Sequence, residues 1–327
     1  MSNVEVKPQD ILLNITGDSV ARVCAVDSRV LPARVNQHVA IIRPDENRVL
    51  SSYILYFLEM IKPYLLQIAA GGATRNALTK SMIENLELEV PDILSQKKIV
   101  SVLDDIQGKI RENSEINKNL SDLLQSIYQK LFGEIRLGAN QGILSDICSY
   151  SKEKVAVSEL NVNTYFSTEN MLPEKAGSTK ATNLPTTPQT TACRKGDTLI
   201  SNIRPYFKKI VYCEDMCGCS TDVLCFTPVQ SQYAAYLFST LYTDKFFAFM
   251  VAGSKGTKMP RGDKQQIMTY PVVLPAESEL EEFNAIAFPV LEQLNSNKAE
   301  NKRLSALRDA LLPKLMSGEI DISAIDL

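Results

Sequence analysis

The sequence predicts an α+β fold in which two mixed α/β domains are each followed by a long helix, and the two helices pair as an antiparallel coiled coil. The first observation is an internal repeat, because residues 10–135 and 197–320 share one pattern of strands, loops and helix ends. The second is a heptad stripe of apolar residues that closes each copy. The third is a polar interruption at the same place in both stripes. The chain of 327 residues is long enough for two domains with cores of their own.

The repeat sets the expected division of the chain. Lys80 and Lys264 form a clear matched pair, because they lie 184 positions apart (264 − 80 = 184) and each follows a Gly-containing loop. Residues 10–13 and 197–200 are the matched strand-like segments that open the two copies. The expected parts are a first domain at residues 1–91 and a first long helix at residues 92–139. A second domain at residues 140–275 and a second long helix with a tail at residues 276–327 follow.

The second domain is expected to be mostly β-structure with one amphipathic helix inside it. Its strands are expected at residues 198–203, 208–213 and 222–227. Its helix is expected at residues 233–250, and a Gly-rich loop at residues 253–261. The first domain is expected to lack about 45–50 residues that the second has, because the shared pattern begins at Asp10 and at Asp197. Three explanations stay open: the first domain folds without them, another chain supplies them, or the gene is truncated.

The two long helices carry matched polar positions in an otherwise apolar seam. Asn113 and Asn117 interrupt the first stripe, and Asn297 and Asn301 interrupt the second. If the helices run antiparallel with paired numbers summing to 414, Asn113 faces Asn301 and Asn117 faces Asn297. An Asn is costly in an apolar seam but can hydrogen-bond to its opposite number, so these pairs predict the register. The alternative is a surface helix packed on each domain, which needs neither a strict heptad period nor matched Asn positions.

Basic residues cluster at two places in the second domain, and these are the candidate DNA contacts. The net charge of −3 does not exclude nucleic-acid binding, because only the contact face must be basic. Small loop residues let backbone amides approach phosphate, Lys and Arg neutralise it, and Arg can bind guanine through two hydrogen bonds. The alternative is that these are solvated charges on turns. The candidates are Arg204, Tyr206, Lys208 and Lys209 in the first cluster, Lys255, Thr257, Lys258, Arg261 and Lys264 in the second, and Arg75, Asn76 and Lys80 in the matching loop of the first domain.

The sequence lacks the motifs of several enzyme classes. It contains no Asn/Asp-Pro-Pro-aromatic motif for adenine methylation and no GxxxxGK[ST] loop for ATP hydrolysis. The single histidine, His38, is expected to be structural. The cysteines at 213, 217, 219 and 225 are irregularly spaced, so we expect small apolar residues there in preference to a zinc site. We therefore expect a non-catalytic chain with neither metal nor cofactor of its own.

The composition also bears on the compartment. No apolar run approaches the ~18–20 residues that a membrane helix needs. The first residues, Met1-Ser2-Asn3-Val4-Glu5, have neither the basic cap nor the apolar core of a signal peptide. Seven cysteines without a secretion signal favour reduced thiols. The sequence therefore predicts a cytoplasmic protein that makes no membrane contact.

Several strings together resemble the specificity (S) subunit of type I restriction–modification systems, over essentially the whole chain. The segment LELEVPDILSQKKIVSVLDDIQGKI (86–110) is similar to that family's closing strand, proline linker and helix start. DILLNITG (10–17) and GDTLISNIRPYFKKI (196–210) resemble its recurrent Gly-Asp-strand segment. AGGATRNALT (70–79) and AGSKGTKMPRGD (252–263) resemble its Gly/Ser/Thr loop. Both helix ends, LLQSIYQKLFGEI (123–135) and LRDALLPKLMSGEIDI (307–322), are also similar. The departure is the shortened first domain.

The resemblance implies a function that the residues alone do not establish. In that family two target recognition domains each recognise one half of a split DNA sequence, and the helices set the spacing between the halves. Methyltransferase subunits and restriction/translocase subunits join the assembly. The resemblance also implies that S-adenosylmethionine, ATP and Mg²⁺ are bound by those partner subunits. The alternative is a truncated paralogue that does not recognise DNA and acts as a decoy subunit or a recombination cassette.

Overall fold

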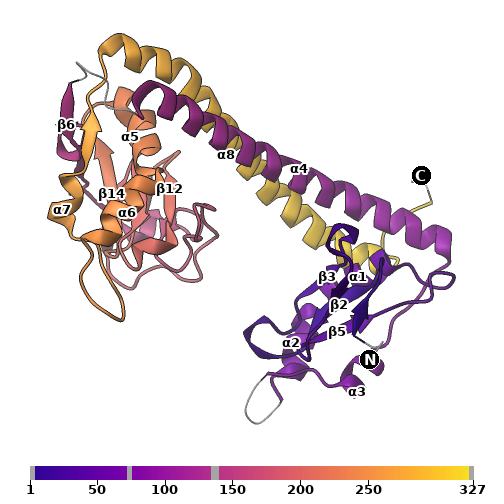
Figure 1. The fold of residues 1–327 in the computed structure, drawn as a ribbon. Coiled ribbons are helices and arrows are strands. Elements are labelled where there is room, and N and C mark those ends of the chain that lie inside the picture. Colours follow the sequence, from indigo (N-terminus) through magenta and orange to yellow (C-terminus); the bar gives the residue numbers. More distant parts are fainter. Residues whose placement is uncertain (1–3, 72–75, 134–139, 324–327) are drawn as a thin grey trace. The chain divides into compact units, whose positions relative to one another are not determined.

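The computed structural model describes residues 4–71, 76–133 and 140–323, and it divides into two compact units. Unit 1 comprises Met1–Ser114 with Lys298–Leu327, and unit 2 comprises Glu115–Asn297. Each unit contains one half of each long helix, α4 (Ile93–Phe132) and α8 (Glu277–Met316) (Figure 1). Among the described residues, no helix is both long and apolar enough to cross a membrane.

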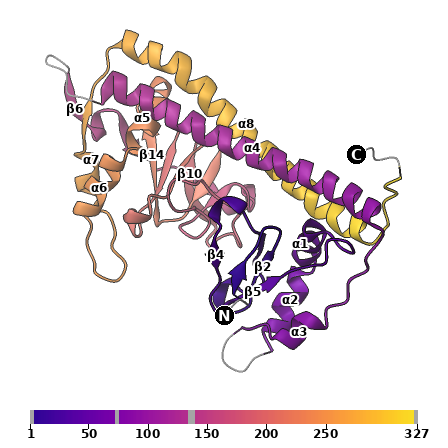
Figure 2. The same cartoon turned by 45° about the vertical axis from the view of Figure 1, so that its right-hand side comes forward.

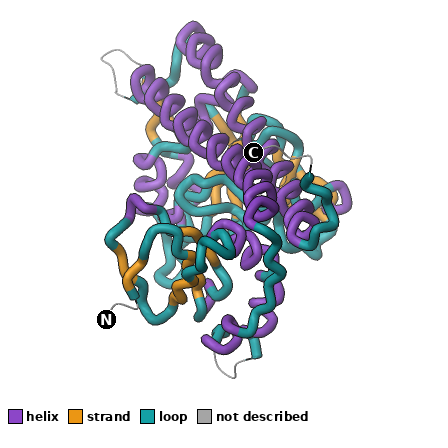
Figure 3. Tube along the Cα trace, turned by 90° about the vertical axis from the view of Figure 1, so that its right-hand side faces the viewer, coloured by secondary structure: helices purple, strands orange, loops and turns teal. Residues whose placement is uncertain are grey.

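Unit 2 is built from two four-stranded sheets and one strand pair. Figure 2 labels three of its strands, β6, β10 and β14, and Figure 3 colours the strands orange. One sheet has the order β12-β11-β14-β7 and the other the order β8-β10-β13-β9. The strands are β6 (Gln141–Ile143), β7 (Cys148–Tyr150), β8 (Lys154–Ala156), β9 (Tyr165–Phe166), β10 (Gln189–Cys193), β11 (Thr198–Ser201), β12 (Ile210–Tyr212), β13 (Cys217–Cys219), β14 (Val223–Pro228) and β15 (Pro271–Val273). Strands β15 and β6 pair antiparallel and bring the two ends of the domain together.

Helices cover one face of the first sheet of unit 2. They are α5 (Ala234–Leu241), α6 (Asp244–Ala252) and α7 (Lys264–Met268), and single turns of 3-10 helix lie at η3 (Leu144–Asp146), η4 (Val157–Glu159), η5 (Pro205–Phe207) and η6 (Ser231–Tyr233). The expected single helix at 233–250 is wrong, because it breaks between α5 and α6. Thr243 causes the restart, since its hydroxyl accepts a hydrogen bond from the Phe246 N–H at 3.1 Å and caps α6.

The core of unit 2 joins this sheet to its half of the helix pair. Tyr128 and Phe132 of α4 pack with Phe283 of α8 and with Tyr236 of α5, with ring centroids between 5.0 and 6.3 Å apart. The opposite face of the sheet packs on the β8-β10-β13-β9 sheet through a second cluster of buried residues rich in cysteine. Because both faces are covered, all four residues of β11 are buried.

Unit 1 repeats part of this plan. Its three-stranded sheet has the order β3-β2-β5, and a separate pair is formed by β1 and β4. The elements are β1 (Glu5–Val6), β2 (Ile11–Asn14), β3 (Val23–Ala25), β4 (Ala33–Arg34), β5 (Val39–Ile42), α1 (Ser51–Met60), α2 (Lys62–Ala69) and α3 (Lys80–Glu84), with 3-10 turns η1 (Gly17–Ser19) and η2 (Ser28–Val30). Within the described part of unit 1, no strand takes the place that β7 occupies beside β14 in unit 2.

The same turn opens the central strand of both units. Asp10 accepts a hydrogen bond from the Lys7 N–H at 2.6 Å, and Asp197 accepts one from the Arg194 N–H at 2.8 Å. Both carboxylates belong to residues that are 1% exposed. Asp10 additionally pairs with Arg43 at 2.6 Å. The internal repeat in the sequence is therefore also a repeat of backbone structure.

The pKa values of Asp10 and Asp197 shift in opposite directions from the ordinary value of an aspartate. Burial by itself raises the pKa of Asp10, but hydrogen bonds from Arg43 and from the Lys7 N–H outweigh it, so the pKa lies below its ordinary value. Burial also raises the pKa of Asp197, and there the hydrogen bonds from the Arg194 N–H and the Cys225 thiol do not overcome it. The difference follows from the guanidinium of Arg43, which stabilises the ionised form.

The long helices pair antiparallel through their polar positions. In unit 1, the Asn113 side-chain amide donates to Oδ1 of Asn301 at 3.0 Å. In unit 2, the Asn297 amide donates to Oδ1 of Asn117 at 2.9 Å. These are the two pairs that the sum of 414 specifies. Asn113 and Asn297 are 2% and 5% exposed, so each hydrogen bond satisfies a buried amide group.

Candidate nucleic-acid interface

In unit 2 the two predicted basic clusters lie against each other. The Arg204 N–H donates to the Pro260 carbonyl at 2.8 Å, and Ile203 forms an antiparallel bridge with Arg261. The Gly262 N–H donates to the Asn202 carbonyl at 3.3 Å. The loop between α6 and α7, which Figure 1 shows projecting from the unit, is therefore docked on the turn that follows β11.

Gly262 allows this close approach. A Cβ atom at Gly262 would lie 2.8 Å from the Asn202 side-chain oxygen and 2.9 Å from methyl carbons of Ile267 and Met250. Within the loop, the N–H and C=O groups of Lys255 and Arg261 exchange two hydrogen bonds of 2.9 Å. The loop thus has a hairpin-like base, and residues 256–260 form its end.

Two of the predicted DNA contacts are engaged within unit 2. Lys208 pairs with Asp244 at 3.1 Å, and that hydrogen bond raises the pKa of the Lys208 amine. The Lys209 amine donates to the Thr168 carbonyl at 2.6 Å, and its burial lowers its pKa. Both amines are therefore used to hold the turn in place. The pairing of Lys208 with Asp244 could not be predicted from the sequence, because Asp244 lies 36 positions beyond Lys208 (244 − 208 = 36).

The cationic side chains of the loop differ in whether they form an ion pair. Lys255 pairs with Asp263 at 2.6 Å, and Arg261 pairs with Asp222 at 3.0 Å. The hydrogen bond from Lys255 lowers the pKa of Asp263, with further help from backbone N–H groups of α7. Lys258 is exposed, and it has no ion pair with any residue that the structure describes. Lys258 is therefore the loop cation available to a phosphate without breaking an existing pair.

The remaining predicted residues of unit 2 lie on the same surface. Thr257 is exposed at the end of the loop, and Lys264 is the exposed first residue of α7. Tyr206 is 47% exposed in the turn, and its neighbour Phe207 is 37% exposed. Phe207 and Met259, which is 48% exposed, were missed as candidates. Their exposure was not visible in the sequence, where both resemble core residues.

Unit 1 contains the matching loop and turn. The Gly17 N–H donates to the Asn76 carbonyl at 3.1 Å, and Thr16 forms an antiparallel bridge with Ala77. These contacts correspond to Arg204 with Pro260 and Ile203 with Arg261 in unit 2. Asn76 is exposed, and Lys80 pairs with Glu84 at 3.4 Å on the surface of α3. Arg75 lies outside the described residues.

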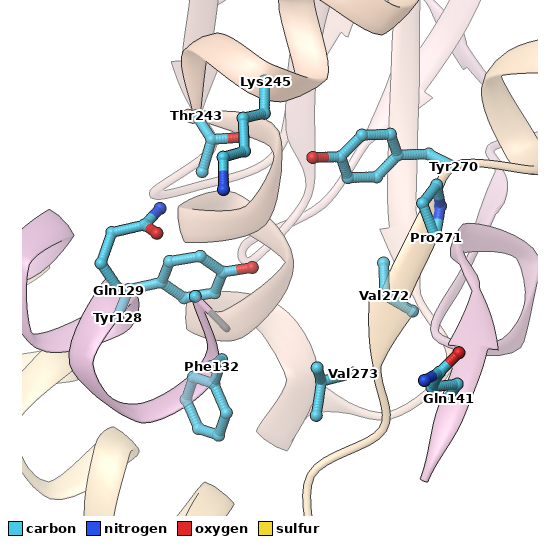
Figure 4. A pocket seen from close by; sticks show the side chains of 11 residues that line it. Tyr128, Gln129, Phe132, Gln141, Thr243, Lys245, Tyr270, Pro271, Val272 and Val273 are labelled. Carbon is cyan, nitrogen blue, oxygen red and sulfur yellow. The ribbon is translucent and has the colours of Figure 1, made fainter. Parts of the chain in front are cut away.

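A cavity of about 180 Å³ lies elsewhere in unit 2, beside the end of α4 (Figure 4). Aromatic and aliphatic side chains line much of it, including Tyr128, Phe132 and Val272. Figure 4 shows the Tyr270 hydroxyl and the Lys245 amine directed towards its interior. Among its lining residues no carboxylate, thiol or imidazole accompanies that amine, so the cavity contributes no acid–base pair to the interface.

The cysteines of unit 2 are core residues. Cys193, Cys213, Cys217, Cys219 and Cys225 all belong to the buried cluster between the two sheets. The Cys217 thiol lies 3.5 Å from the Cys213 sulfur, and the Cys225 thiol lies 3.2 Å from Asp197. Throughout the ranges that the structure covers, no group of three or more potential ligands is arranged to hold a metal ion.

Part of the sequence is similar to known proteins. Residues 3–122 match the family model of the type I restriction modification DNA specificity domain. The chain is 24% identical over 155 residues to the type I restriction enzyme HindI specificity subunit of Haemophilus influenzae, covering 46% of this chain and 34% of the relative. It is 30% identical over 76 residues to the MjaIX specificity subunit of Methanocaldococcus jannaschii, covering 23% of this chain and 18% of that one. The matched part thus spans about a third or less of these relatives.

A solved structure extends the similarity to the fold of nearly the whole chain. The crystal structure of the type I restriction-modification system S subunit from M. genitalium superposes with a TM-score of 0.55, covering 96% of this chain and 84% of that one at 17% identity. At that identity the likeness concerns the fold alone. Residues 3–122 are thus similar in sequence to the DNA specificity domain of type I restriction–modification systems, and the fold of nearly the whole chain resembles that of an S subunit.

Proposed function

We propose that the chain is the DNA-recognition subunit of a type I restriction–modification complex and recognises a split target. In this proposal each unit contacts one half of the target through the loop docked on its central strand turn. The carrying observation is that this docking occurs twice, at Arg204 with Pro260 and at Gly17 with Asn76. A loop held by backbone hydrogen bonds presents its side chains with little loss of conformational freedom on binding.

The helix pair is the proposed spacer between the two contact surfaces. Each long helix has 40 residues, which corresponds to about 60 Å at ~1.5 Å per residue. The Asn pairs oppose a slipped register, since a slip would leave buried amides without partners. A fixed register suits a spacer, because it fixes the number of base pairs between the two halves of the target.

The two units are proposed to contribute unequally. Unit 2 presents the exposed Lys258 with Arg261 and Lys264 on its loop and α7, whereas the described part of the unit 1 loop presents Asn76 and Lys80. Unit 2 is therefore proposed to recognise one half-site, and unit 1 to add weak base specificity unless another chain completes it.

Catalysis is assigned to partner subunits in this proposal. Methyltransferase subunits would bind S-adenosylmethionine, and restriction/translocase subunits would bind ATP and Mg²⁺, so this chain would need no cofactor. The sequence supports this, since it has neither the adenine-methylation motif nor the phosphate-binding loop. A cytoplasmic location follows from the same proposal, because the target is cellular or invading DNA.

The test is DNA binding by the full chain assembled with the methyltransferase subunits of the same system. The assembly should bind duplex DNA with an affinity that falls steeply with salt, and Arg261→Ala should weaken binding to the preferred sequence by about 1–3 kcal/mol if Arg261 contacts a base. An assembly that forms but does not bind DNA would support the alternative of a decoy subunit. Changes at Asn76 that alter specificity while those at 255–261 do not would show that unit 1 is the working unit.

A further inference from the structure

Three large apolar side chains are exposed on the turn and loop that dock in unit 2. Tyr206, Phe207 and Met259 are 47%, 37% and 48% exposed, and we call them the apolar tip. The Tyr206 and Phe207 rings lie 4.8 Å apart. The Arg204–Pro260 hydrogen bond of 2.8 Å brings the turn with the two rings beside the loop with Met259. Single exposed apolar residues are common, but three on two docked segments form a local patch.

We propose that the apolar tip contacts the base or sugar faces of duplex DNA, beside the phosphate contact made by Lys258. The inference rests on the proposed function, since it assigns a further contact to the same surface. Aromatic rings stack on bases, and inserted apolar side chains occupy base steps in many DNA complexes. Such a contact differs chemically from the phosphate contacts predicted for the lysines.

The backbone beneath the tip is held in an unfavourable conformation. Arg204 and Lys208, on either side of the rings, adopt left-handed φ angles of 49° and 51°. Residues with a Cβ rarely adopt this conformation, and a run of such strain is typical of sites where function requires it. Here the two left-handed residues produce the sharp turn that directs Tyr206 and Phe207 away from the core.

Contacts from two other segments of unit 2 hold the backbone of this turn in place. The N–H groups of Glu174 and Lys175 donate to the carbonyls of Phe207 and Lys208 at 2.8 and 3.0 Å. The Lys208 amine pairs with Asp244 at 3.1 Å. A rigid turn loses little conformational entropy on binding, which favours a contact that the free protein already presents.

The charges around the tip favour a polyanion as its occupant. Lys258 directly precedes Met259, is exposed and has no ion pair among the residues that the structure describes. Duplex DNA offers a phosphate for an exposed cation such as Lys258 together with apolar base and sugar faces. An apolar protein surface would leave the charge of Lys258 uncompensated.

The experiment compares the salt dependence of DNA binding for four forms of the full chain, each assembled with the methyltransferase subunits of the same system, with a fluorescein-labelled duplex of mixed sequence as the probe. The forms are the unchanged chain, Lys258→Ala, the Tyr206→Ala/Phe207→Ala variant, and Met216→Ala. Met216 is the matched control, because it is 59% exposed in unit 2 and lies outside the tip. Circular dichroism and a melting curve check that each variant is folded.

The proposal predicts a different signature for each variant. Loss of the rings should weaken binding about ten-fold at every salt concentration and leave the slope of log K against log salt unchanged, because no phosphate contact is removed. Lys258→Ala should reduce that slope by about 0.9. Met216→Ala should bind like the unchanged chain.

The outcomes separate this inference from the proposed function. If Lys258→Ala reduces the slope while the ring variant binds normally, the apolar tip is refuted and DNA recognition stands. If the ring variant changes the slope and not the intercept, its effect is electrostatic and the base or sugar contact is refuted. If the unchanged chain binds no DNA, both ideas fail. The single variant Tyr206→Phe keeps both rings and removes only the hydroxyl. If it binds like the unchanged chain while the Tyr206→Ala/Phe207→Ala variant has lost affinity, the contact is through the ring face and not the hydroxyl.

Discussion

The side-chain amide of Asn297 donates a hydrogen bond to Oδ1 of Asn117 at 2.9 Å, across the two long helices of unit 2. A single polar pair in an apolar seam costs stability but selects one register. Because a second pair, Asn113 with Asn301, lies in unit 1 at 3.0 Å, a slip of either helix would break both. The register of the helix pair is thus specified at two points.

The Asn pair should behave as a coupled unit. Asn297→Ala should lower the free energy of unfolding by about 1–3 kcal/mol, because it leaves Oδ1 of the half-buried Asn117 without its donor. Changing both Asn117 and Asn297 to Ala should cost less than the two single changes to Ala together, with a coupling energy of about 0.5–3 kcal/mol. Urea unfolding of the four forms measures this. Asn163→Ala, at an exposed position, is the control, and additive single effects would contradict the coupling.

Two glycines should respond in opposite directions to the same change. Gly262→Ala should destabilise the loop docking by about 1–3 kcal/mol and weaken DNA binding, because its Cβ would meet Asn202 at 2.8 Å. Gly108→Ala should raise the free energy of unfolding by up to about 1 kcal/mol, because Gly108 lies within α4 with nothing inside 4 Å of its added Cβ. Melting temperatures of both variants decide this. A neutral Gly262→Ala would mean that the close approach has no consequence.

Asp10 should make the stability of unit 1 depend on pH. The folded pKa lies below the ordinary value, so the ionised carboxylate is favoured in the folded state. The resulting stability is fully present above the unfolded pKa and is lost as the pH falls through the lower folded pKa. Asp10→Asn should therefore cost about 1–3 kcal/mol near neutral pH and little in acid.

The measurement for Asp10 is urea unfolding at a series of pH values. The unchanged chain and Asp10→Asn should converge in stability as the pH falls. The control is Asp18→Asn, because Asp18 is exposed and forms no ion pair with the described residues. A difference between the Asp10 forms that is the same at neutral and acid pH would show that Arg43 does not favour the ionised carboxylate.

The features predicted from the sequence are those that leave a periodic or repeated signal. The helix register followed from Asn113 and Asn301, because polar residues in a buried seam must find partners. The match of Asp10 with Asp197 located the central strands, because both aspartates close the same turn. Long-range pairs left no such signal: Asp244 binds Lys208, and this contact depends on how α6 packs on the turn. The break between α5 and α6 was missed because the apolar residues on both sides of Thr243-Asp244-Lys245 fit one amphipathic helix, although Thr243 is a residue type that often caps a new helix.

The most direct test of the account is selection of binding sites from a random duplex library by the full chain assembled with its methyltransferase subunits. The account predicts enrichment of a defined sequence, with the stronger half specified by unit 2 and relaxed at one position by Arg261→Ala. Enrichment of no sequence by an intact assembly would contradict the central claim that this chain recognises DNA.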